Sequence, residues 1–386
     1  MTENMNTVVE QKNNWDDFAL HSDLLRSIYS YGFEFPSDIQ KKAIPHILAR
    51  RDLIAQAQSG TGKTGAFVIS SLQLIDVKVN TTQVVIIAPT HELVNQIKTV
   101  ALNLSGFMEG LRIKTLVGGT NVNQDVYELK HNTPHLVVGC TGRIYDMVKR
   151  RALNMRTLKL WVLDEADELL SHGFKEQIQN IFYYLPEKAR IALFSATLPD
   201  YVLKLTEKFM TDPVSIIVKR EELSLEGINQ YFVAAHGDND KYSILKDLMK
   251  EINMTQVIIY VNSINRVYML YDFMEKDGFS VCCIHSNMNK EKRAEVVEDF
   301  RKSKYRIMIS SNITARGLDI QQVSIVINYD ITRSVDTYLH RIGRSGRWGR
   351  KGTAINFITR EDIQSIKNIE SHYSINIREL PANVAF

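Results

Sequence analysis

The sequence predicts an α/β protein of two domains, each a mostly parallel sheet covered by helices. Short β-rich runs alternate with helix-length amphipathic segments along the whole chain, which is typical of such sheets. A length of 386 residues is long for one core and comfortable for two. The charged run Lys219-Arg220-Glu221-Glu222 separates two series of strands. We therefore place a linker at 220–227, between domains 1–219 and 228–386.

Runs rich in β-branched and aliphatic residues predict the strands of both domains. The first series is Leu53–Ala55, Val84–Ala88, Leu136–Gly139, Trp161–Leu163, Ile191–Phe194 and Ser215–Val218. The second series is Val257–Val261, Val281–Ile284, Arg306–Ser310, Ser324–Asn328 and Ala354–Ile358. Helices are expected between them, for example over Asp200–Met210 and Lys290–Arg301.

Composition favours a soluble intracellular protein. Hydrophobic residues make up 44% of the chain and charged residues 24%, and the net charge of +3 is too small to indicate nucleic acid by itself. The three cysteines have no metal-ligand spacing, which suits a reducing compartment. No apolar run approaches the ~20 residues of a membrane span. We expect a cytoplasmic location, with a nuclear one as the alternative, and no contact with a membrane.

A phosphate-binding loop follows the first apolar run. Ala57-Gln58-Ser59-Gly60-Thr61-Gly62-Lys63-Thr64 leads from a strand into a helix-like segment. Gly60 and Gly62 let backbone N–H groups curl round an anion at the positive end of the new helix. Lys63 can reach the β- and γ-phosphates, and the Thr64 hydroxyl can ligate Mg²⁺. The candidate nucleotide-binding residues are Gln58, Ser59, Gly60, Thr61, Gly62, Lys63 and Thr64.

An acidic run at the end of another strand supplies the carboxylates that a phosphate loop requires. Leu160–Leu163 leads directly into Asp164-Glu165-Ala166-Asp167. The first carboxylate, Asp164, can hold Mg²⁺, and Glu165 can align the attacking water. An isolated pair of acidic residues is more often a solvated turn, but its place after a strand favours catalysis here. The chain is thus expected to bind and hydrolyse a nucleoside triphosphate.

A basic run in the second half offers candidate arginine fingers. His340–Lys351 holds five Arg or Lys residues among twelve. Arg344 and Arg347 are three residues apart, so one helical turn would place them on one face. A guanidinium group stays charged and suits a phosphoryl group that gains charge in the transition state. The alternative, a generic basic patch, is less favoured because the first domain has no finger of its own.

In this order the motifs resemble those of the DEAD-box ATP-dependent RNA helicases, from Trp15 to about Phe386. The resemblance implies two RecA-like domains with ATP and RNA bound across the cleft between them. Gly32–Gln40 resembles the Q motif, in which Gln40 would read adenine, and Trp15 stands in the place of its isolated aromatic. Asp319, in Ala315–Asp319, would hold the ribose. Residues implied to couple hydrolysis to RNA are Asp167, Ser195, Thr197 and His340.

The same resemblance implies contacts with the sugar-phosphate backbone of single-stranded RNA. The implied contact residues are Pro89, Thr90, Gly119, Gly142, Arg143, Asn262 and Ser311. Several positions depart from the family pattern: His91 replaces an arginine, Thr141 a proline, Lys290 a glutamine and Asn312 an aspartate. These departures lie in the parts that bind or couple RNA, whereas the parts that cleave ATP match. We therefore expect ATPase activity to be more robust than unwinding.

Within the family, Glu221–Ile228 is similar to the interdomain segment of eukaryotic initiation factor 4A. The leading hypothesis is a monomeric RNA-dependent ATPase that unwinds short RNA duplexes in translation initiation, with an initiation-factor 4G-like scaffold as partner. The alternative is an ATP-locked RNA clamp that nucleates an mRNA–protein complex, as in the exon junction. A DNA helicase is disfavoured by the Q motif and the Asp-Glu-Ala-Asp run.

Two tryptophans carry a more specific expectation. Trp15 and Trp348 stand where the factor 4A subgroup commonly has Phe or Tyr, one in each domain. We expect them to stack on the two faces of adenine, at about 1–3 kcal/mol per base as on other aromatic platforms. The alternative is that both rings only cover apolar surface.

Overall fold

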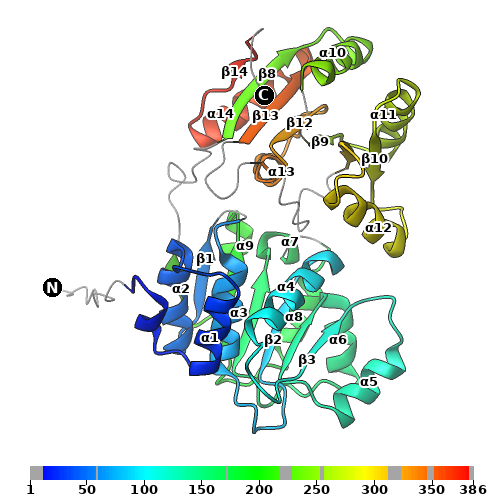
Figure 1. Ribbon diagram of the computed structural model, residues 1–386. Coiled ribbons are helices and arrows are strands. Elements are labelled where there is room, and N and C mark those ends of the chain that lie inside the picture. Colours follow the sequence, from blue (N-terminus) through cyan, green and yellow to red (C-terminus); the bar gives the residue numbers. More distant parts are fainter. Residues whose placement is uncertain are drawn as a thin grey trace, which may run out of the picture. The chain divides into compact units, whose positions relative to one another are not determined.

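The computed structural model describes residues 12–57, 60–170, 173–216, 228–252, 256–311, 323–345 and 352–381. The chain separates into two compact units, residues 1–217 and 218–386. The expected linker at 220–227 lies outside the described residues, so its bounds stay a prediction. Figure 1 shows the elements of both units and labels most of them.

The described part of unit 1 contains a seven-stranded parallel sheet in the order β3-β4-β2-β5-β6-β1-β7. The strands are short runs dominated by aliphatic side chains, as buried parallel strands require. Their bounds are β1 Leu53–Gln56, β2 Val84–Ile87, β3 Ile113–Leu116, β4 Leu136–Gly139, β5 Leu160–Asp164, β6 Arg190–Ser195 and β7 Val214–Ile216.

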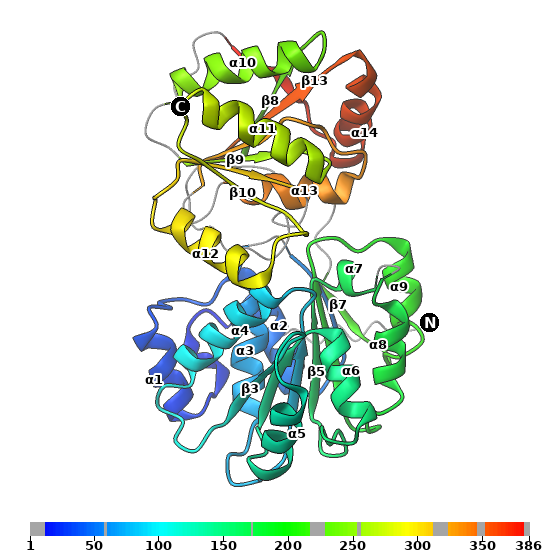
Figure 2. The same ribbon diagram turned by 90° about the vertical axis from the view of Figure 1, so that its right-hand side faces the viewer.

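Helices cover both faces of this sheet, and alternate strand residues point to each face. Ile86 and Val162 pack with α1–α4, whereas Ile87 and Leu163 pack with α6, α8 and α9. Figure 2 shows these two groups of helices on opposite sides of the sheet. The bounds are η1 Trp15–Phe18, α1 Ser22–Ser30, α2 Asp38–Leu48, α3 Lys63–Leu74, α4 His91–Leu104, α5 Val122–His131, α6 Thr141–Lys149, α7 Ala166–Leu169, α8 Lys175–Phe182 and α9 Asp200–Thr206.

Unit 2 repeats the architecture, with a parallel sheet in the order β10-β11-β9-β12-β13-β8-β14 over its described residues. The strands are β8 Ile228–Ala234, β9 Val257–Tyr260, β10 Val281–Ile284, β11 Ile307–Ser310, β12 Ile325–Asn328, β13 Gly352–Ile358 and β14 Arg378–Glu379. The helices are α10 Asp238–Glu251, α11 Ile264–Lys276, α12 Lys290–Arg301, α13 Val335–Ile342, η4 Arg360–Asp362 and α14 Ile363–Tyr373. One core lies under α10 and α11, and two smaller cores lie under α12 and under α13 with α14.

The predicted fold class is therefore confirmed, with differences at individual elements. β3 was missed because Ile113–Leu116 contains Lys114 and Thr115 and reads as a polar segment. β8 was missed because its alternating, half-buried residues directly follow the expected linker. The helix expected over Asp200–Met210 ends at Thr206 and continues as turns. The helix expected over Lys290–Arg301 has the predicted bounds.

Both parallel sheets collect candidate site residues at the carboxyl ends of their strands, where open α/β sheets bind ligands. In unit 1, the phosphate loop follows β1, the Pro89-Thr90 pair follows β2, and the acidic run begins at the end of β5. In unit 2, Asn262 follows β9 and Ser311 follows β11. The fold thus brings residues that are far apart in the sequence to one edge of each sheet.

No helix among the described residues is long and apolar enough to cross a membrane. The three cysteines are free thiols. Burial raises the pKa of Cys282 to about 12, so this thiol stays protonated and behaves as a small apolar side chain.

Candidate active site

The described part of the phosphate loop has the backbone that an anion-binding turn needs. Gly60 and Gly62 adopt φ values of +84° and +102°, which L side chains rarely adopt. Gly62 caps α3, and its carbonyl accepts the first helical hydrogen bond from Ala66. Lys63 and Thr64 therefore stand in the first turn of α3, where backbone N–H groups have no helical partner. The predicted residues Gln58 and Ser59 lie outside the described residues.

The Q-motif segment packs directly on this loop. The Gln40 side-chain amide donates to the Gly62 carbonyl at 3.2 Å and accepts from the Ser37 N–H at 2.8 Å. A Cβ atom at Gly62 would lie 2.6 Å from the Ser37 hydroxyl, and one at Gly65 only 2.5 Å from Gln40. In this structure Gln40 thus holds the loop in place, and reading adenine would require its amide to exchange these partners.

The acidic run makes a tight turn at the end of β5. Glu165 adopts φ +50°, a left-handed conformation that is uncommon outside glycine. Its N–H donates to Oδ1 of Asp164 at 3.0 Å. The turn brings Oε1 of Glu165 to 3.9 Å from the Lys63 ammonium, so the phosphate loop and the acidic run meet. Strained backbone of this kind is typical of functional sites.

These groups are prepared for a charged ligand. Burial, and then the Glu165 carboxylate, raise the pKa of Asp164 to about 7, although Lys63 acts in the opposite direction. Among the described residues, Lys63 Nζ and Glu165 Oε2 are buried without a hydrogen-bond partner. A carboxylate and a hydroxyl, from Asp164 and Thr64, are ligands that suit Mg²⁺. The arrangement therefore fits a triphosphate with its magnesium ion.

Asp167 links the acidic run to the end of β6. The Thr197 hydroxyl donates to Oδ2 of Asp167 at 2.6 Å, and the Asp167 N–H donates to the Ser195 hydroxyl at 3.3 Å. All three residues are buried. The structure therefore brings together the three unit 1 residues that were expected to couple hydrolysis to RNA.

The candidate RNA-binding residues of unit 1 differ in how exposed they are. Thr90 caps α4 by accepting from the Leu93 N–H. Gly119 and Gly142 are exposed, and Gly119 has φ +86°. Arg143 is 8% exposed and is ion-paired with Asp125. Its guanidinium group is committed to partners inside the unit, and its expected direct contact with RNA stays a prediction.

In unit 2, Asn262 follows β9 and belongs to a hydrogen-bond network with Arg341. Its amide oxygen accepts from the Arg341 guanidinium at 2.7 Å, and its amide nitrogen donates to the Ile331 carbonyl at 2.8 Å. Arg341 also donates to the Asp330 carbonyl at 2.7 Å, and burial lowers its pKa to about 10. Sequence reasoning overlooked Arg341, although it lies in the same basic run as Arg344.

The basic run begins inside α13 and leaves it at Ile342. His340 is in the last turn of α13, and Arg344 follows the helix with its Nε near the His340 carbonyl. Ser311 follows β11 at a half-buried position. Four further predicted residues lie outside the described part of the chain: Asn312, Asp319, Arg347 and Trp348. Whether Arg344 and Arg347 share a face therefore stays a prediction.

Trp15 does not stand where adenine stacking requires it. Its indole is completely buried, with ring contacts to Phe18 at 5.7 Å and Phe33 at 6.2 Å between centroids. A ring with no exposed surface has no free face on which a base could stack. Phe33 borders the loop instead, because a Cβ atom at Gly65 would lie 3.2 Å from its ring. The Gly32-Phe33 pair, upstream of α2 in the Q motif, was the available signal.

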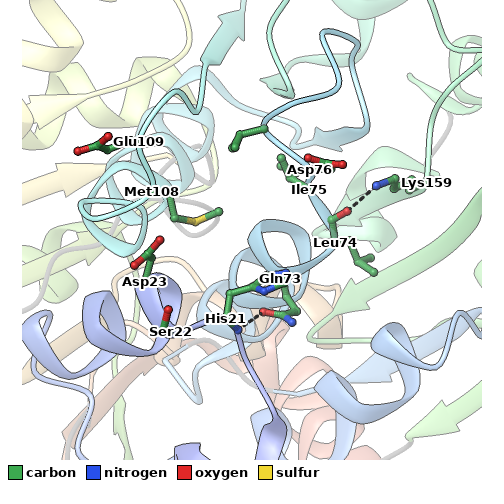
Figure 3. A pocket seen from close by; sticks show the side chains of 11 residues that line it. His21, Ser22, Asp23, Gln73, Leu74, Ile75, Asp76, Met108, Glu109 and Lys159 are labelled. Atoms are coloured by element: carbon green, nitrogen blue, oxygen red, sulfur yellow. Dashed lines mark hydrogen bonds between the residues drawn. The ribbon is translucent and has the colours of Figure 1, made fainter.

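A cavity of about 540 Å³ lies at the other end of α3, away from the phosphate loop. Figure 3 shows Lys159 reaching the Leu74 carbonyl and the His21 backbone reaching the Gln73 side chain. Three carboxylates, Asp23, Asp76 and Glu109, are among its lining residues. Because α3 begins at Lys63 and ends at Leu74, this cavity is separate from the nucleotide site.

Comparison with known families decides what this site belongs to. Residues 37–205 match the DEAD/DEAH box helicase family, and residues 240–349 match the Helicase conserved C-terminal domain. The chain belongs to the DEAD-box family of ATP-dependent RNA helicases. As a member it is an ATP-binding enzyme, and the acidic run after β5 is the motif from which the family takes its name.

Individual relatives agree over nearly the whole chain. The sequence is 48% identical to the ATP-dependent RNA helicase FAL1 of Coccidioides immitis, over 96% of this chain and 92% of the relative. The fold is similar to S. cerevisiae Dbp5 bound to RNA and ADP BeF3, with a TM-score of 0.89, 30% identity and 96% of each chain covered. Mss116p bound to ssRNA and AMP-PNP gives a TM-score of 0.85 at 26% identity, over 95% of this chain and 79% of that one.

Proposed function

We propose that this helicase is an RNA-stimulated ATPase that separates short RNA duplexes locally, in translation initiation. The observation that carries the proposal is the buried contact between Asp167, in the acidic run, and Thr197, in the segment that follows β6. This contact joins the acidic run, which is proposed to cleave ATP, to the segment that follows β6. The candidate RNA contacts of unit 1 lie at the same edge of the sheet. RNA binding can thereby change the geometry of hydrolysis.

For the chemical step, Lys63 neutralises the β- and γ-phosphates and Glu165 orients the attacking water. Thr64 and Asp164 would hold Mg²⁺, which neutralises charge on the phosphates. Phe33 takes the place of Trp15 as the aromatic surface next to adenine, and Trp15 supports it from behind. Arg344, with Arg347, stabilises the charge that develops on the transferred phosphoryl group. Both units are then needed for turnover.

Single-stranded RNA is the proposed polynucleotide. Dbp5 was solved with RNA and Mss116p with ssRNA, and this chain has their fold. Gly119 and Gly142 in unit 1 leave room for a sugar-phosphate backbone because they are exposed and carry no side chain. Contacts with the RNA sugar-phosphate backbone do not discriminate between RNA sequences.

The role in translation initiation rests on the similarity of Glu221–Ile228 to factor 4A. It implies a cytoplasmic location and a scaffold that resembles initiation factor 4G. Such a scaffold would raise turnover by favouring the RNA-bound, hydrolysis-competent state.

The test measures RNA-stimulated ATPase with and without the middle domain of initiation factor 4G. We expect RNA to stimulate turnover and the scaffold to increase it further. Turnover that RNA does not change would overturn the RNA-dependent ATPase. Stimulation without any effect of the scaffold, together with slow RNA release in ATP, would replace translation initiation by the RNA-clamp alternative.

A further inference from the structure

Each of two exposed glycines in unit 1 is followed by a residue whose side chain is hydrogen-bonded to groups inside the unit. Gly119 precedes Thr120 in the loop after β3, and Gly142 precedes Arg143 in the first turn of α6. The Arg143 guanidinium donates to the Thr120 hydroxyl at 2.7 Å and to the Thr120 carbonyl at 2.9 Å. The two glycine positions are therefore linked through their neighbours.

The link is centred on Asp125, a carboxylate of α5 that is only 3% exposed. Its Oδ2 accepts from the Thr120 hydroxyl at 3.1 Å and pairs with Arg143. Its Oδ1 lies 3.0 Å from the ammonium group of Lys114 in β3. A buried carboxylate with two cations and a hydroxyl around it is fully compensated, so it fixes the positions of all its partners.

The sequence gives a reason why such a link matters in this chain. Thr141 stands at the start of α6 where the family has a proline, whose ring would fix the backbone φ angle. The first turn of α6 therefore lacks that backbone restraint. The bonds from Arg143 to Asp125 and Thr120 supply one from the side chain.

We propose that Asp125 is the positioning residue for the RNA-binding edge of unit 1. Through Arg143 and Thr120 it holds the backbone N–H groups near Gly119 and Gly142 in the arrangement that the phosphates of one RNA strand require. Neither Asp125 nor Arg143 contacts RNA. The proposal deepens the proposed function and rests on its assumption that these glycines line the RNA path.

The direction in which one substitution changes RNA affinity distinguishes a positioning role from a simple electrostatic effect. Asp125→Asn removes a negative charge near a polyanion, so electrostatics alone would tighten RNA binding. Positioning requires the opposite, a loss of about tenfold in affinity, as expected when a charged hydrogen bond is lost. The slope of log Kd against log salt should not change, because no phosphate contact has been removed.

The experiment uses the full chain with a non-hydrolysable ATP analogue and a short fluorescent oligouridine, titrated at several salt concentrations. Glu128→Gln is the matched control, because it removes the same charge from α5 but contacts Lys114 and not the Thr120 loop. It should leave RNA affinity unchanged or slightly tighter. Thr120→Val is the second variant, at an exposed position where folding is not at risk. It should weaken RNA binding in the same direction as Asp125→Asn.

The outcomes are distinct. Wild-type affinity in Thr120→Val, or tighter binding in Asp125→Asn, overturns the positioning role. An Arg143→Gln variant that lowers the salt slope by about one overturns it too, because that loss marks a direct phosphate contact. If the wild-type chain itself does not bind the oligouridine, the proposed function fails instead.

Discussion

The Thr197 hydroxyl donates a 2.6 Å hydrogen bond to Oδ2 of Asp167, which joins the end of β6 to the acidic run after β5. Both side chains are buried, so water cannot replace the contact if it is lost. The Tyr201 hydroxyl adds a second tie at 2.7 Å, to the carbonyl of Asp167. The acidic run is thus fixed to the segment that follows β6 by side chain and by backbone.

Thr197→Val should uncouple hydrolysis from strand separation. The substitution keeps the shape but removes the hydroxyl that donates to the buried Asp167 carboxylate, and a hydrogen bond to a charged group contributes about 1.5–3 kcal/mol. We expect near-normal ATP affinity and a loss of roughly tenfold or more in duplexes separated per ATP. Thr206→Val is the control, since Thr206 is also buried but its hydroxyl donates to the Leu203 carbonyl within α9. Equal losses in both variants would show a general packing effect instead.

Glu165→Gln should slow hydrolysis on the order of 10²–10⁴-fold, the range of a positioned base, while ATP affinity is retained. Lys63→Ala should weaken ATP binding as well as turnover, because its ammonium group is proposed to neutralise the β- and γ-phosphates. Single-turnover hydrolysis and equilibrium nucleotide binding separate the two effects. Glu168→Gln, in the short helix α7 that follows Glu165, should behave like the wild type. Rapid turnover in Glu165→Gln would remove this residue from the mechanism.

Arg344→Ala, or Arg347→Ala, should reduce turnover by about 10³-fold or more, as loss of an arginine finger does. Arg333→Ala is the control because Arg333 is an exposed arginine of the same unit. A fragment of residues 1–219 should bind nucleotide weakly and show no RNA-stimulated turnover. The finger assignment does not survive if the fragment alone reaches the stimulated rate of the full chain.

Trp15→Ala and Phe33→Leu should affect different properties. Trp15 is a fully buried core residue, so its truncation should lower the free energy of unfolding of unit 1 by about 3–5 kcal/mol. Phe33→Leu keeps an apolar side chain but loses the aromatic face next to the loop. It should raise the Kd for ATP with little change in stability. Urea unfolding and nucleotide titration measure the two quantities, and an unchanged ATP affinity in Phe33→Leu would leave adenine without a unit 1 platform.

His135 should make unit 1 less stable in acid. Burial, and then the charge of Arg112, lower the pKa of His135 below its usual 6.5. Its Nδ1 accepts a hydrogen bond from the Arg112 N–H at 3.1 Å, which a protonated ring could not do. The unfolded state binds more protons between the lowered pKa and 6.5. The stability contribution is therefore complete above pH 6.5 and is lost as the pH falls through the lowered value.

The measurement is urea unfolding of the full chain between pH 5 and 8. His135→Gln should flatten the pH dependence of the unit 1 transition, whereas His131→Gln, at an exposed position, should leave the slope as in the wild type. An equal slope in His135→Gln and the wild type would assign the acid sensitivity to other groups.

The local chemistry of the site could be predicted from the sequence, because it is built from contiguous residues. For the phosphate loop and for the acidic run, the strand, the turn and the candidate ligand residues all lie within about ten consecutive residues. Their strand–loop order was enough to predict that both would lie at the carboxyl edge of one parallel sheet, and β1 and β5 do so. Most strands were found for a related reason, since aliphatic runs such as Val84–Ile87 are buried on both faces.

Tertiary structure alone decided which of the candidate side chains are available to ligands. Arg143 and Trp15 carry suitable chemistry at suitable positions in the sequence, yet one is paired with Asp125 and the other is enclosed by Phe18 and Phe33. Asp125 lies 18 residues from Arg143, and no local pattern connects them. Pairing and burial depend on contacts between segments that are distant in sequence. A motif therefore determines which groups are present, and packing determines which of them remain free to act.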